Sequence, residues 1–293
     1  MSQWDAVIVG AGPAGLSAAL NLARARRRVL VLDSNRPRNS ATFHAHGFLS
    51  RDGISPLELR RLGREELEAY PEASYERSVV SSIEPGFTVA HTGGVASARA
   101  VIIATGLREL PPALPSLRQF YGTSAHSCME CDGYEYADRP IALVGESDDL
   151  AERALLLSQW SRDLVVFTNG ADVVDAASEA RLAERGARVE RRPVRDVAGD
   201  RSGITGVVLA DGEVVPRAGV FIRPDYEAVL DFADPLGLAR DAHGLIVTDP
   251  DGRASASGVY AMGDVTPPGP QQLIVAAGMG ARVAAALNRD LLG

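Results

Sequence analysis

Cysteine is scarce in this sequence of 293 residues, which contains only two, so at most one disulfide can form within the chain. Cationic residues are outnumbered, because 30 Lys and Arg face 38 Asp and Glu and give a formal net charge of −8. A nucleic-acid-binding surface needs clustered cations, so we expect no nucleic-acid partner. No apolar run approaches the ~20 residues that span a bilayer, and the first ten residues lack a basic start followed by an apolar core. We therefore expect a cytoplasmic protein with no membrane partner.

The two cysteines, Cys128 and Cys131, lie three positions apart in the stretch HSCMECDG. In a reducing compartment such a pair is more often redox-active or metal-binding than a structural staple. A structural zinc site needs four ligands, and His126 is the only further candidate close by. A passive buried thiol pair is a third interpretation. The spacing alone leaves these interpretations open, and the rest of the sequence favours a redox dithiol without a metal.

Two stretches of the chain have the order of a β-α-β unit. In the first, a continuous apolar strand at 5–10 is followed by a glycine-rich turn, a helical pattern and a second strand at 29–33. The same order recurs at 139–167, after a cluster of prolines at 110–117 that indicates a domain crossing. Residues 204–216 have the pattern of a hairpin. We therefore predict an α/β protein with two Rossmann-like dinucleotide-binding domains.

The turn of the first unit, GAGPAG, has the spacing G-x-G-x-x-G directly after a strand and at the start of a helix. The first glycine permits a tight turn, the second allows a pyrophosphate to approach the backbone, and the third lets the helix pack on the strand. The N-terminus of the helix also attracts phosphate. Asp33 ends the second strand, where a carboxylate can bind ribose hydroxyls. The dinucleotide-binding residues predicted here are Gly10, Gly12, Pro13, Ala14, Gly15 and Asp33.

The order of the remaining segments is more specific. VIIATG at 101–106 precedes the proline-rich crossing, then come CMECDG and RPIALVG, and VYAMGDV at 259–265 leads into a final helix that begins QQLIVAAGMG. This order resembles that of the low-molecular-weight thioredoxin reductases over nearly the whole chain. The resemblance implies a homodimer that binds FAD. It also implies an FAD-binding domain formed by 1–111 and 246–293, and an inserted NAD(P)H-binding-like domain at 112–245 that carries the C-x-x-C.

The same resemblance implies roles for single residues. Cys131 corresponds to the flavin-facing sulfur and Cys128 to the interchange sulfur, while Asp132 matches the family's acid, which moves a proton on or off the dithiol. His126, two positions before the pair, is a candidate base. The segment FHAHGFL corresponds to one that passes near the flavin ring, where His44 or His46 could act as base or hydrogen-bond donor. The further flavin contacts that we predict are His46, Gly106, Gly263, Asp264 and Gln272.

The second β-α-β unit departs from the family pattern at its turn, GESDDL. Gly145 is retained, but a serine and a leucine take the second and third glycine positions, and two aspartates add negative charge where a phosphate would bind. After the next strand, an asparagine and a glycine stand in place of the arginines that hold the 2′-phosphate of NADPH in the family. These changes argue against NAD(P)H as a cofactor. The residues that depart are Ser147, Asp148, Asp149, Leu150, Asn169 and Gly170.

Dithiol oxidases of the gliotoxin and holomycin type resemble this combination of fold, FAD, C-x-x-C and a lost NADPH site. They commonly have an aromatic residue within the cysteine pair, where this chain has Met129 and Glu130. The leading hypothesis is therefore a FAD-dependent enzyme that oxidises a small dithiol to a disulfide and passes the electrons to oxygen. One alternative is an NAD(P)H-dependent reductase of thioredoxin or another protein disulfide. The other is a flavin redox sensor without significant turnover.

Overall fold

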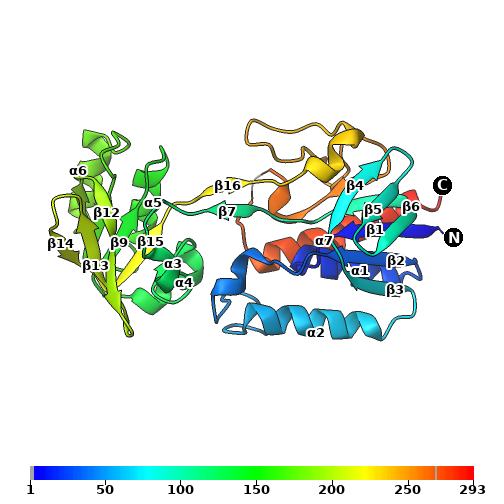
Figure 1. Ribbon diagram of the computed structural model, residues 1–293, viewed down its shortest axis with the longest axis horizontal. Helices are drawn as coiled ribbons and strands as arrows, with labels where there is room; N and C mark the ends of the chain where they lie inside the picture. The colour runs from blue at the N-terminus through cyan, green and yellow to red at the C-terminus, as the bar shows by residue number, and fades with distance from the viewer. Residues whose placement is uncertain (1–2, 268) are drawn as a thin grey trace. The chain divides into compact units, whose positions relative to one another are not determined.

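Two units, each built on a parallel sheet, make up the computed structural model, which describes residues 3–267 and 269–293. Unit 1 comprises the described residues up to Ser40 together with Gly47–Arg108 and Tyr226–Gly293. Unit 2 comprises Ala41–His46 and Glu109–Asp225. The two units are distinguished by colour in Figure 1, where unit 2 is mainly green. The predicted α/β class with two Rossmann-like units is confirmed.

Unit 1 contains a seven-stranded sheet in the order β3-β2-β1-β6-β5-β4, in which β17 also pairs with β6. The pairs β3-β2, β2-β1, β1-β6 and β17-β6 are parallel, whereas β4, β5 and the start of β6 form an antiparallel meander. The central strands are buried on both faces, which explains why they appear in the sequence as continuous apolar runs. The strands are β1 (Trp4–Val9), β2 (Val29–Asp33), β3 (Ala73–Arg77), β4 (Val80–Glu84), β5 (Thr88–His91), β6 (Gly94–Ile103) and β17 (Val259–Ala261).

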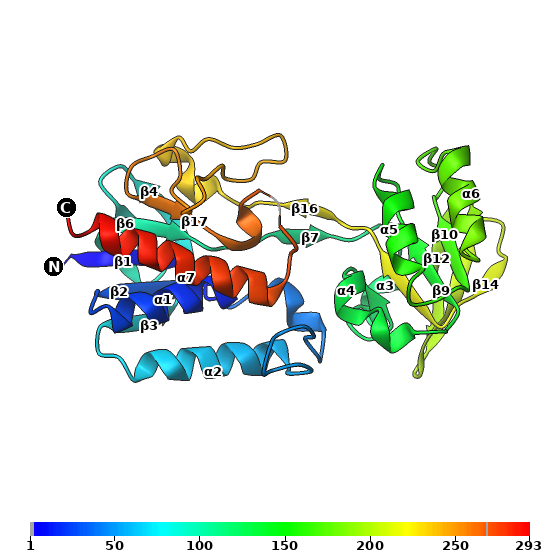
Figure 2. The same ribbon diagram turned by 180° about the vertical axis from the view of Figure 1, so that it is seen from behind.

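Helices cover one face of this sheet, with α1 (Pro13–Arg24) packed against α7 (Leu273–Asp290) and α2 (Pro56–Glu68) beside α1 (Figures 1 and 2). The contact between α1 and α7 is close, because a Cβ on Gly280 would lie 2.2 Å from the carbonyl oxygen of Ala14. The other face is covered by the meander and by the segment that contains η3 (Asp231–Leu236). Unit 1 thus has a three-layer arrangement, with the glycine-rich turn between β1 and α1. Two further short helices are η4 (Gly263–Val265), in unit 1, and η1 (Arg38–Ala41), whose last residue belongs to unit 2.

Unit 2 contains a five-stranded parallel sheet in the order β11-β10-β9-β15-β8 and a three-stranded antiparallel sheet, β12-β13-β14. The small sheet and α3 pack on one face of the parallel sheet, while α5, α6 and the segment around α4 and η2 pack on the other. The β13-β14 pair confirms the predicted hairpin. The strands are β8 (Ala125–His126), β9 (Ile141–Val144), β10 (Leu164–Phe167), β11 (Arg188–Glu190), β12 (Val194–Asp200), β13 (Gly203–Leu209), β14 (Val214–Pro216) and β15 (Gly219–Ile222). The helices are α3 (Leu117–Phe120), α4 (Met129–Asp132), η2 (Tyr134–Tyr136), α5 (Leu150–Leu157) and α6 (Ala176–Glu184).

The division between the units differs from the predicted boundaries of 111 and 246. The chain crosses through β7 (Arg108–Leu110) and β16 (Asp225–Glu227), which pair with each other. The return comes earlier than predicted because Leu230 and Ala233 are buried in the core of unit 1 together with Ile246. The sequence between β16 and Ile246 has no clear periodicity, so only the burial of these side chains reveals where the segment belongs. Among the described helices, none combines the length and apolarity that a membrane crossing requires.

Candidate functional site

The glycine-rich turn of unit 1 has the geometry of a phosphate cradle. A Cβ on Gly10 would lie 2.4 Å from the carbonyl oxygen of Ala104, and a Cβ on Gly15 would lie 1.9 Å from the carbonyl oxygen of Gly10, so neither position accepts a side chain. Gly12, the N-cap of α1, instead faces open space, with no atom within 4 Å of a Cβ built on it. A helix N-terminus that ends in open space, with N–H groups available, is the arrangement that binds a pyrophosphate. These residues therefore fit a dinucleotide such as FAD.

Asp33 supports this turn from inside the unit. Its Oδ1 accepts a hydrogen bond from the backbone N–H of Ala11 at 3.1 Å, and its Oδ2 accepts one from Arg60 Nη2 at 2.6 Å. Arg60 also donates from Nε to the carbonyl oxygen of Ala11 at 3.2 Å and from Nη1 to Asn35 Oδ1 at 3.2 Å. The ion pair of Asp33 and Arg60 thus holds both polar groups of the Ala11 residue. A carboxylate oxygen has two lone pairs, so Oδ1 of Asp33 can accept a ribose hydroxyl in addition to the N–H of Ala11, and that role stays a prediction.

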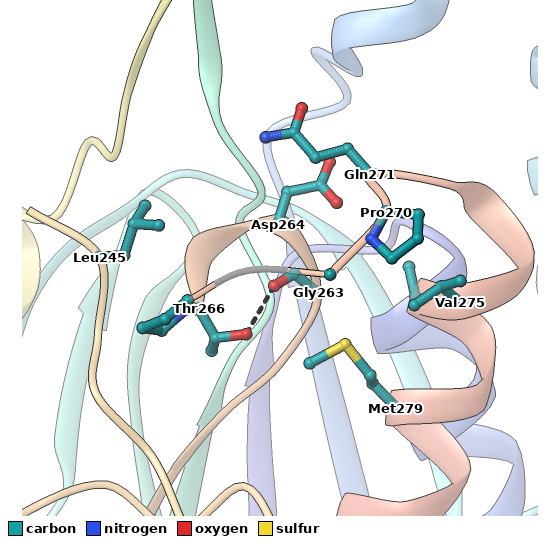
Figure 3. A pocket seen from close by; sticks show the side chains of 11 residues that line it. Leu245, Gly263, Asp264, Thr266, Pro270, Gln271, Val275 and Met279 are labelled. Carbon is teal, nitrogen blue, oxygen red and sulfur yellow. Dashed lines mark hydrogen bonds between the residues drawn. The ribbon is translucent and has the colours of Figure 1, made fainter. Parts of the chain in front are cut away.

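A pocket in unit 1 opens beside the late Gly-Asp pair, as Figure 3 shows. Gly263 comes close to the glycine-rich turn, because a Cβ on it would lie 3.3 Å from Cβ of Ala14. Asp264 pairs with Arg38, whose Nη2 lies 2.8 Å from Oδ2 of Asp264 and whose Nη1 donates to Gln271 Oε1 at 3.1 Å. The structure therefore joins two motifs that are far apart in the sequence. It also adds a cation, Arg38, that sequence reasoning did not identify.

The predicted site residues fall into two groups. Unit 1 holds Gly10, Gly12, Pro13, Ala14, Gly15, Asp33, Gly106, Gly263, Asp264 and Gln272, and unit 2 holds His46, His126, Cys128, Cys131 and Asp132. Pro13 occupies the first turn of α1, and Gln272 is the N-cap of α7. His46 lies in unit 2 with its Nε2 3.5 Å from Glu135 Oε1. A flavin contact by His46 stays a prediction, as do the other individual roles.

Cys128 and Cys131 form a disulfide at the start of α4. Cys128 is the N-cap of this short helix, and its Sγ accepts a hydrogen bond of 3.2 Å from the backbone N–H of Cys131. Such a donor favours negative charge on the sulfur of Cys128 when the disulfide opens. The glycine that follows, Gly133, is required by packing, because a Cβ there would lie 2.7 Å from the ring of Trp160. Glu130, between the cysteines, is exposed to solvent.

Asp132 and His126 form a pair beside the disulfide. His126 Nδ1 lies 3.1 Å from Asp132 Oδ1, and the side chain of His126 is 7% exposed. On the other side of the ring, Nε2 lies 3.2 Å from the hydroxyl of Tyr136, which in turn donates to the carbonyl oxygen of Thr123 at 3.2 Å. Burial raises the pKa of Tyr136 above its ordinary value, against the opposing charge of Arg139, so this hydroxyl stays protonated. The predicted acid and the candidate base are thus in direct contact.

The corresponding turn of the second unit is filled by its own side chains. The carboxylate of Asp149, at the N-cap of α5, receives hydrogen bonds from Ser147 Oγ at 2.5 Å and from Arg223 Nε at 2.9 Å. Burial opposes ionisation of Asp149, but the Ser147 hydroxyl and the Arg223 guanidinium outweigh it, and the pKa of Asp149 is lowered. Arg223 also packs against the turn itself, because a Cβ on Gly145 would lie 2.7 Å from Cβ of Arg223. Leu150, in the third glycine position, is completely buried.

The end of β10 is also occupied by contacts within the unit. Asn169 donates from Nδ2 to Glu146 Oε1 at 2.5 Å, and its Oδ1 accepts from the backbone N–H of Val194 at 2.7 Å. Thr168 is fully buried. Neither of these two contacts of Asn169 involves a cation that could replace the missing arginines. Across residues 3–267 and 269–293, no three His, Cys, Asp or Glu side chains are grouped so that they could hold a metal ion.

Sequence reasoning missed the cations and hydroxyls that support these sites. Arg38, Arg60 and Arg223 each pair with a carboxylate that lies more than 20 positions away in the sequence. Arg223 directly follows the apolar strand β15 in the sequence, but nothing in the sequence indicated that its partner is Asp149. Tyr136 was equally unmarked, although it lies four positions after Asp132 and packs its ring against His126.

Comparison with known proteins gives consistent matches along the chain. Residues 4–280 match the model of the pyridine nucleotide-disulphide oxidoreductase family. The thioredoxin reductase of Streptomyces coelicolor is 30% identical over a region that covers 96% of this chain and 91% of that protein. Among solved structures, HlmI matches with a TM-score of 0.94 and 39% identity, covering 99% of this chain and 93% of its own. An oxidoreductase from Agrobacterium tumefaciens matches with a TM-score of 0.92 and 36% identity, covering 99% of both chains.

Proposed function

Because this chain belongs to the pyridine nucleotide-disulphide oxidoreductase family, as a thioredoxin reductase-like enzyme that acts on thiols and disulfides, we propose that it oxidises a dithiol to a disulfide through Cys128 and Cys131. FAD is the cofactor of this family, and the turn at Gly10 to Gly15 fits it. Oxygen is the proposed final acceptor. Bound FAD would take two electrons from the reduced cysteine pair and pass them to oxygen.

The observation that carries this proposal is the filled turn of unit 2. The carboxylate of Asp149 lies where a cofactor phosphate would need free N–H groups and positive charge. Arg223, a cation at this turn, is already paired with that carboxylate. A pyridine nucleotide would have to break this pair and would meet a negative charge, so electrons are expected to enter through the dithiol instead.

The chemistry at the disulfide is thiol–disulfide exchange. A substrate thiolate attacks Sγ of Cys128, the bond to Cys131 breaks, and Cys131 leaves as a thiolate. The second substrate thiol then attacks the mixed disulfide, which releases the oxidised product and the thiolate of Cys128. The backbone N–H of Cys131, 3.2 Å from Sγ of Cys128, stabilises the charge that forms there. Each attack needs a proton acceptor at neutral pH, because an ordinary thiol has a pKa of about 8.5.

Asp132 and His126 are proposed to accept one of these protons. The hydroxyl of Tyr136 has a single proton and two partners at 3.2 Å, His126 Nε2 and the carbonyl oxygen of Thr123. When the hydroxyl donates to Nε2, His126 is neutral and donates from Nδ1 to Asp132. When the hydroxyl turns to Thr123, Nε2 can carry its own proton and the ring is charged. The histidine can therefore gain or lose a proton while both of its hydrogen bonds are kept.

An anaerobic stopped-flow experiment on the FAD-loaded protein tests the proposal. We expect NADPH and NADH to leave the visible absorbance of the oxidised flavin unchanged, and dithiothreitol to bleach it. Admitting air should restore the absorbance and consume oxygen. A Cys131→Ser variant should not be bleached by dithiothreitol.

The other outcomes decide between the alternatives. Fast, saturable bleaching by a pyridine nucleotide would overturn the proposal in favour of an NAD(P)H-dependent disulfide reductase. Bleaching by dithiothreitol without reoxidation by air would indicate a redox sensor rather than an oxidase. Unchanged bleaching in the Cys131→Ser variant would remove the dithiol from the electron path altogether.

A further inference from the structure

A second chain of hydrogen bonds ends at Ser127, the residue immediately before Cys128 in the sequence. The carboxylate of Glu109 accepts a hydrogen bond on Oε2 from the hydroxyl of Tyr121. The hydroxyl of Tyr121 is 2.9 Å from that of Ser127, the residue immediately before Cys128. All of these residues belong to unit 2. One carboxylate and two hydroxyls, which can accept or pass on a proton, are therefore connected, and the last hydroxyl belongs to the residue next to the interchange cysteine.

The carboxylate of Glu109 is unusual because its other oxygen, Oε1, is buried and makes no hydrogen bond with any residue that the structure describes. Buried polar atoms are normally paired, and an exception calls for an explanation such as a catalytic role. A carboxylate that served only to orient Tyr121 would need one oxygen for this bond, and burying the second oxygen without a partner would cost free energy. A carboxylate that accepts a proton becomes neutral, and its burial is then far less unfavourable.

The direction of the chain follows from proton counting. A carboxylate has no proton to give, so the single hydroxyl proton of Tyr121 goes to Glu109, and the hydroxyl of Ser127 must be the donor to Tyr121. The lone pairs of the Ser127 oxygen are then left to accept a proton from a third group. In the polypeptide, the reacting group nearest to Ser127 is the sulfur of Cys128, which the substrate thiol attacks.

We propose that Ser127, Tyr121 and Glu109 form a proton path that deprotonates the thiol attacking Cys128. This inference rests on the proposed dithiol chemistry and adds a second acceptor to the pair of Asp132 and His126. Oxidation of a dithiol releases two protons, so two acceptors match the two thiols that react.

The step balances in atoms and charge. The attacking thiol gives its proton to Ser127, Ser127 gives its own to Tyr121, and Tyr121 gives its own to Glu109, which becomes a neutral acid. The bond between the substrate sulfur and Sγ of Cys128 forms as the bond between Cys128 and Cys131 breaks. One negative charge is lost at Glu109 and one appears on Cys131, and the enzyme disulfide is the oxidant.

Other charged groups lie close to this path. Arg153 donates from Nη2 to the carbonyl oxygen of Ser127 at 3.1 Å, so a guanidinium lies beside the middle of the chain. Asp132 follows the disulfide in the sequence, whereas its partner His126 immediately precedes Ser127. Removing Tyr121 leaves these groups in place, which makes Tyr121→Phe the narrowest change: it deletes one oxygen and interrupts the path between its two ends.

The expected effect of Tyr121→Phe depends on pH in a way that a structural defect does not. A thiol with a pKa of about 8.5 is about 1% ionised at pH 6.5, so loss of the acceptor should slow the attack by up to about 100-fold at that pH. The deficit should shrink about tenfold for each pH unit and vanish near pH 8.5, where the thiol ionises without help. Glu109→Gln and Ser127→Ala should show the same dependence, because each interrupts the same path.

The test measures the exchange step directly. The FAD-loaded protein is mixed with dithiothreitol anaerobically, quenched with acid, alkylated with N-ethylmaleimide and weighed by mass spectrometry. Because Cys128 and Cys131 are the only cysteines, each added label reports this disulfide without ambiguity. Tyr70→Phe is the matched control, since its hydroxyl only receives a surface hydrogen bond from Arg24 in unit 1.

The outcomes separate this inference from the proposed function. A wild type that is labelled quickly by dithiothreitol but does not reoxidise in air would contradict the oxidase and leave the proton path intact. Equal loss of rate at every pH in Tyr121→Phe, or no loss at pH 6.5, would overturn the path. So would a Glu109→Gln or Ser127→Ala variant that reacts like the wild type at pH 6.5.

Discussion

Replacing Arg60 by methionine removes the buried cation that holds the dinucleotide-binding turn. In the wild type its guanidinium donates to Asp33, to Asn35 and to the carbonyl oxygen of Ala11, and the side chains of Arg60 and Asp33 are only 5% and 9% exposed. Methionine keeps much of the apolar stem but makes none of these bonds. Asp33 would then be a buried carboxylate without its counter-ion, and Ala11 would lose one of the two bonds that fix the turn.

The magnitude follows from the burial of the pair. Removing one partner of a buried ion pair costs about 3–5 kcal/mol, which is a large share of the roughly 5–15 kcal/mol that a folded domain has in total. In the double variant Asp33→Asn with Arg60→Met the buried charge is gone as well, so most of this loss should be recovered. The neighbouring Arg61 is the matched control, because its partners Glu58 and Glu65 are exposed and the same substitution there should have little effect.

Urea unfolding with excess FAD measures the change in stability, and ultrafiltration measures how much FAD stays bound. In a Trp160→Phe background the remaining tryptophan, Trp4, lies in unit 1, so its fluorescence follows the unit that contains Arg60. We expect Arg60→Met to lose both stability and FAD, and Arg61→Met to lose neither. The reasoning is wrong if Arg60→Met and Arg61→Met lose the same stability. It is also wrong if the double variant loses the sum of the stability losses of Asp33→Asn and Arg60→Met, because Asp33 and Arg60 then do not act as a pair.

Two further predictions concern unit 2. Gly133→Ala should destabilise the protein by about 1–3 kcal/mol in thermal unfolding, because its Cβ would lie 2.7 Å from the ring of Trp160. Gly278→Ala, in a helix with no atom within 4 Å of the added Cβ, should be neutral or stabilising in the same assay. The ion pair of Asp149 and Arg223 should make the stability depend on pH in the acid range. The pKa of Asp149 is lowered in the folded protein. The stabilisation by this carboxylate is therefore complete above its ordinary pKa of about 3.9 and is lost as the pH falls through its lowered pKa. Urea midpoints of the wild type and Asp149→Asn should therefore differ at pH 7 and converge in acid, and a difference that stays constant down to acid pH would contradict this assignment.

The sequence predicted the local parts of the fold well because they are coded by neighbouring residues. The strand expected at 29–33 matches β2, and the glycine-rich turn lies between β1 and α1 as expected. Continuous apolar runs and glycine spacing are local signals, and both reflect backbone geometry that the structure requires. The boundary expected at 246 was misplaced for the opposite reason, since Leu230 joins the core of unit 1 through contacts with residues far away in the sequence.

The sequence predicted the residues of the sites only where these residues belong to a local motif. The two cysteines and Asp132 could be identified from a single stretch, and the structure adds the contact of Asp132 with His126. Arg60 and Tyr121 had no such signal, because an arginine in a polar helix and a tyrosine directly after a short helix are ordinary residues until their partners are known. What the sequence could not supply was the pairing of distant charges.

Both units place a carboxylate and an arginine next to the turn between a strand and a helix, with opposite consequences for a cofactor. In unit 1 the pair of Asp33 and Arg60 lies behind the turn and leaves the space in front of Gly12 open. In unit 2 the pair of Asp149 and Arg223 lies at the helix N-terminus itself, where the phosphate would bind. The same type of ion pair therefore supports one turn from behind and occupies the helix N-terminus at the other. A protein arranged in this way would keep one cofactor and use its second unit to carry the dithiol, as the proposed oxidation without a pyridine nucleotide requires.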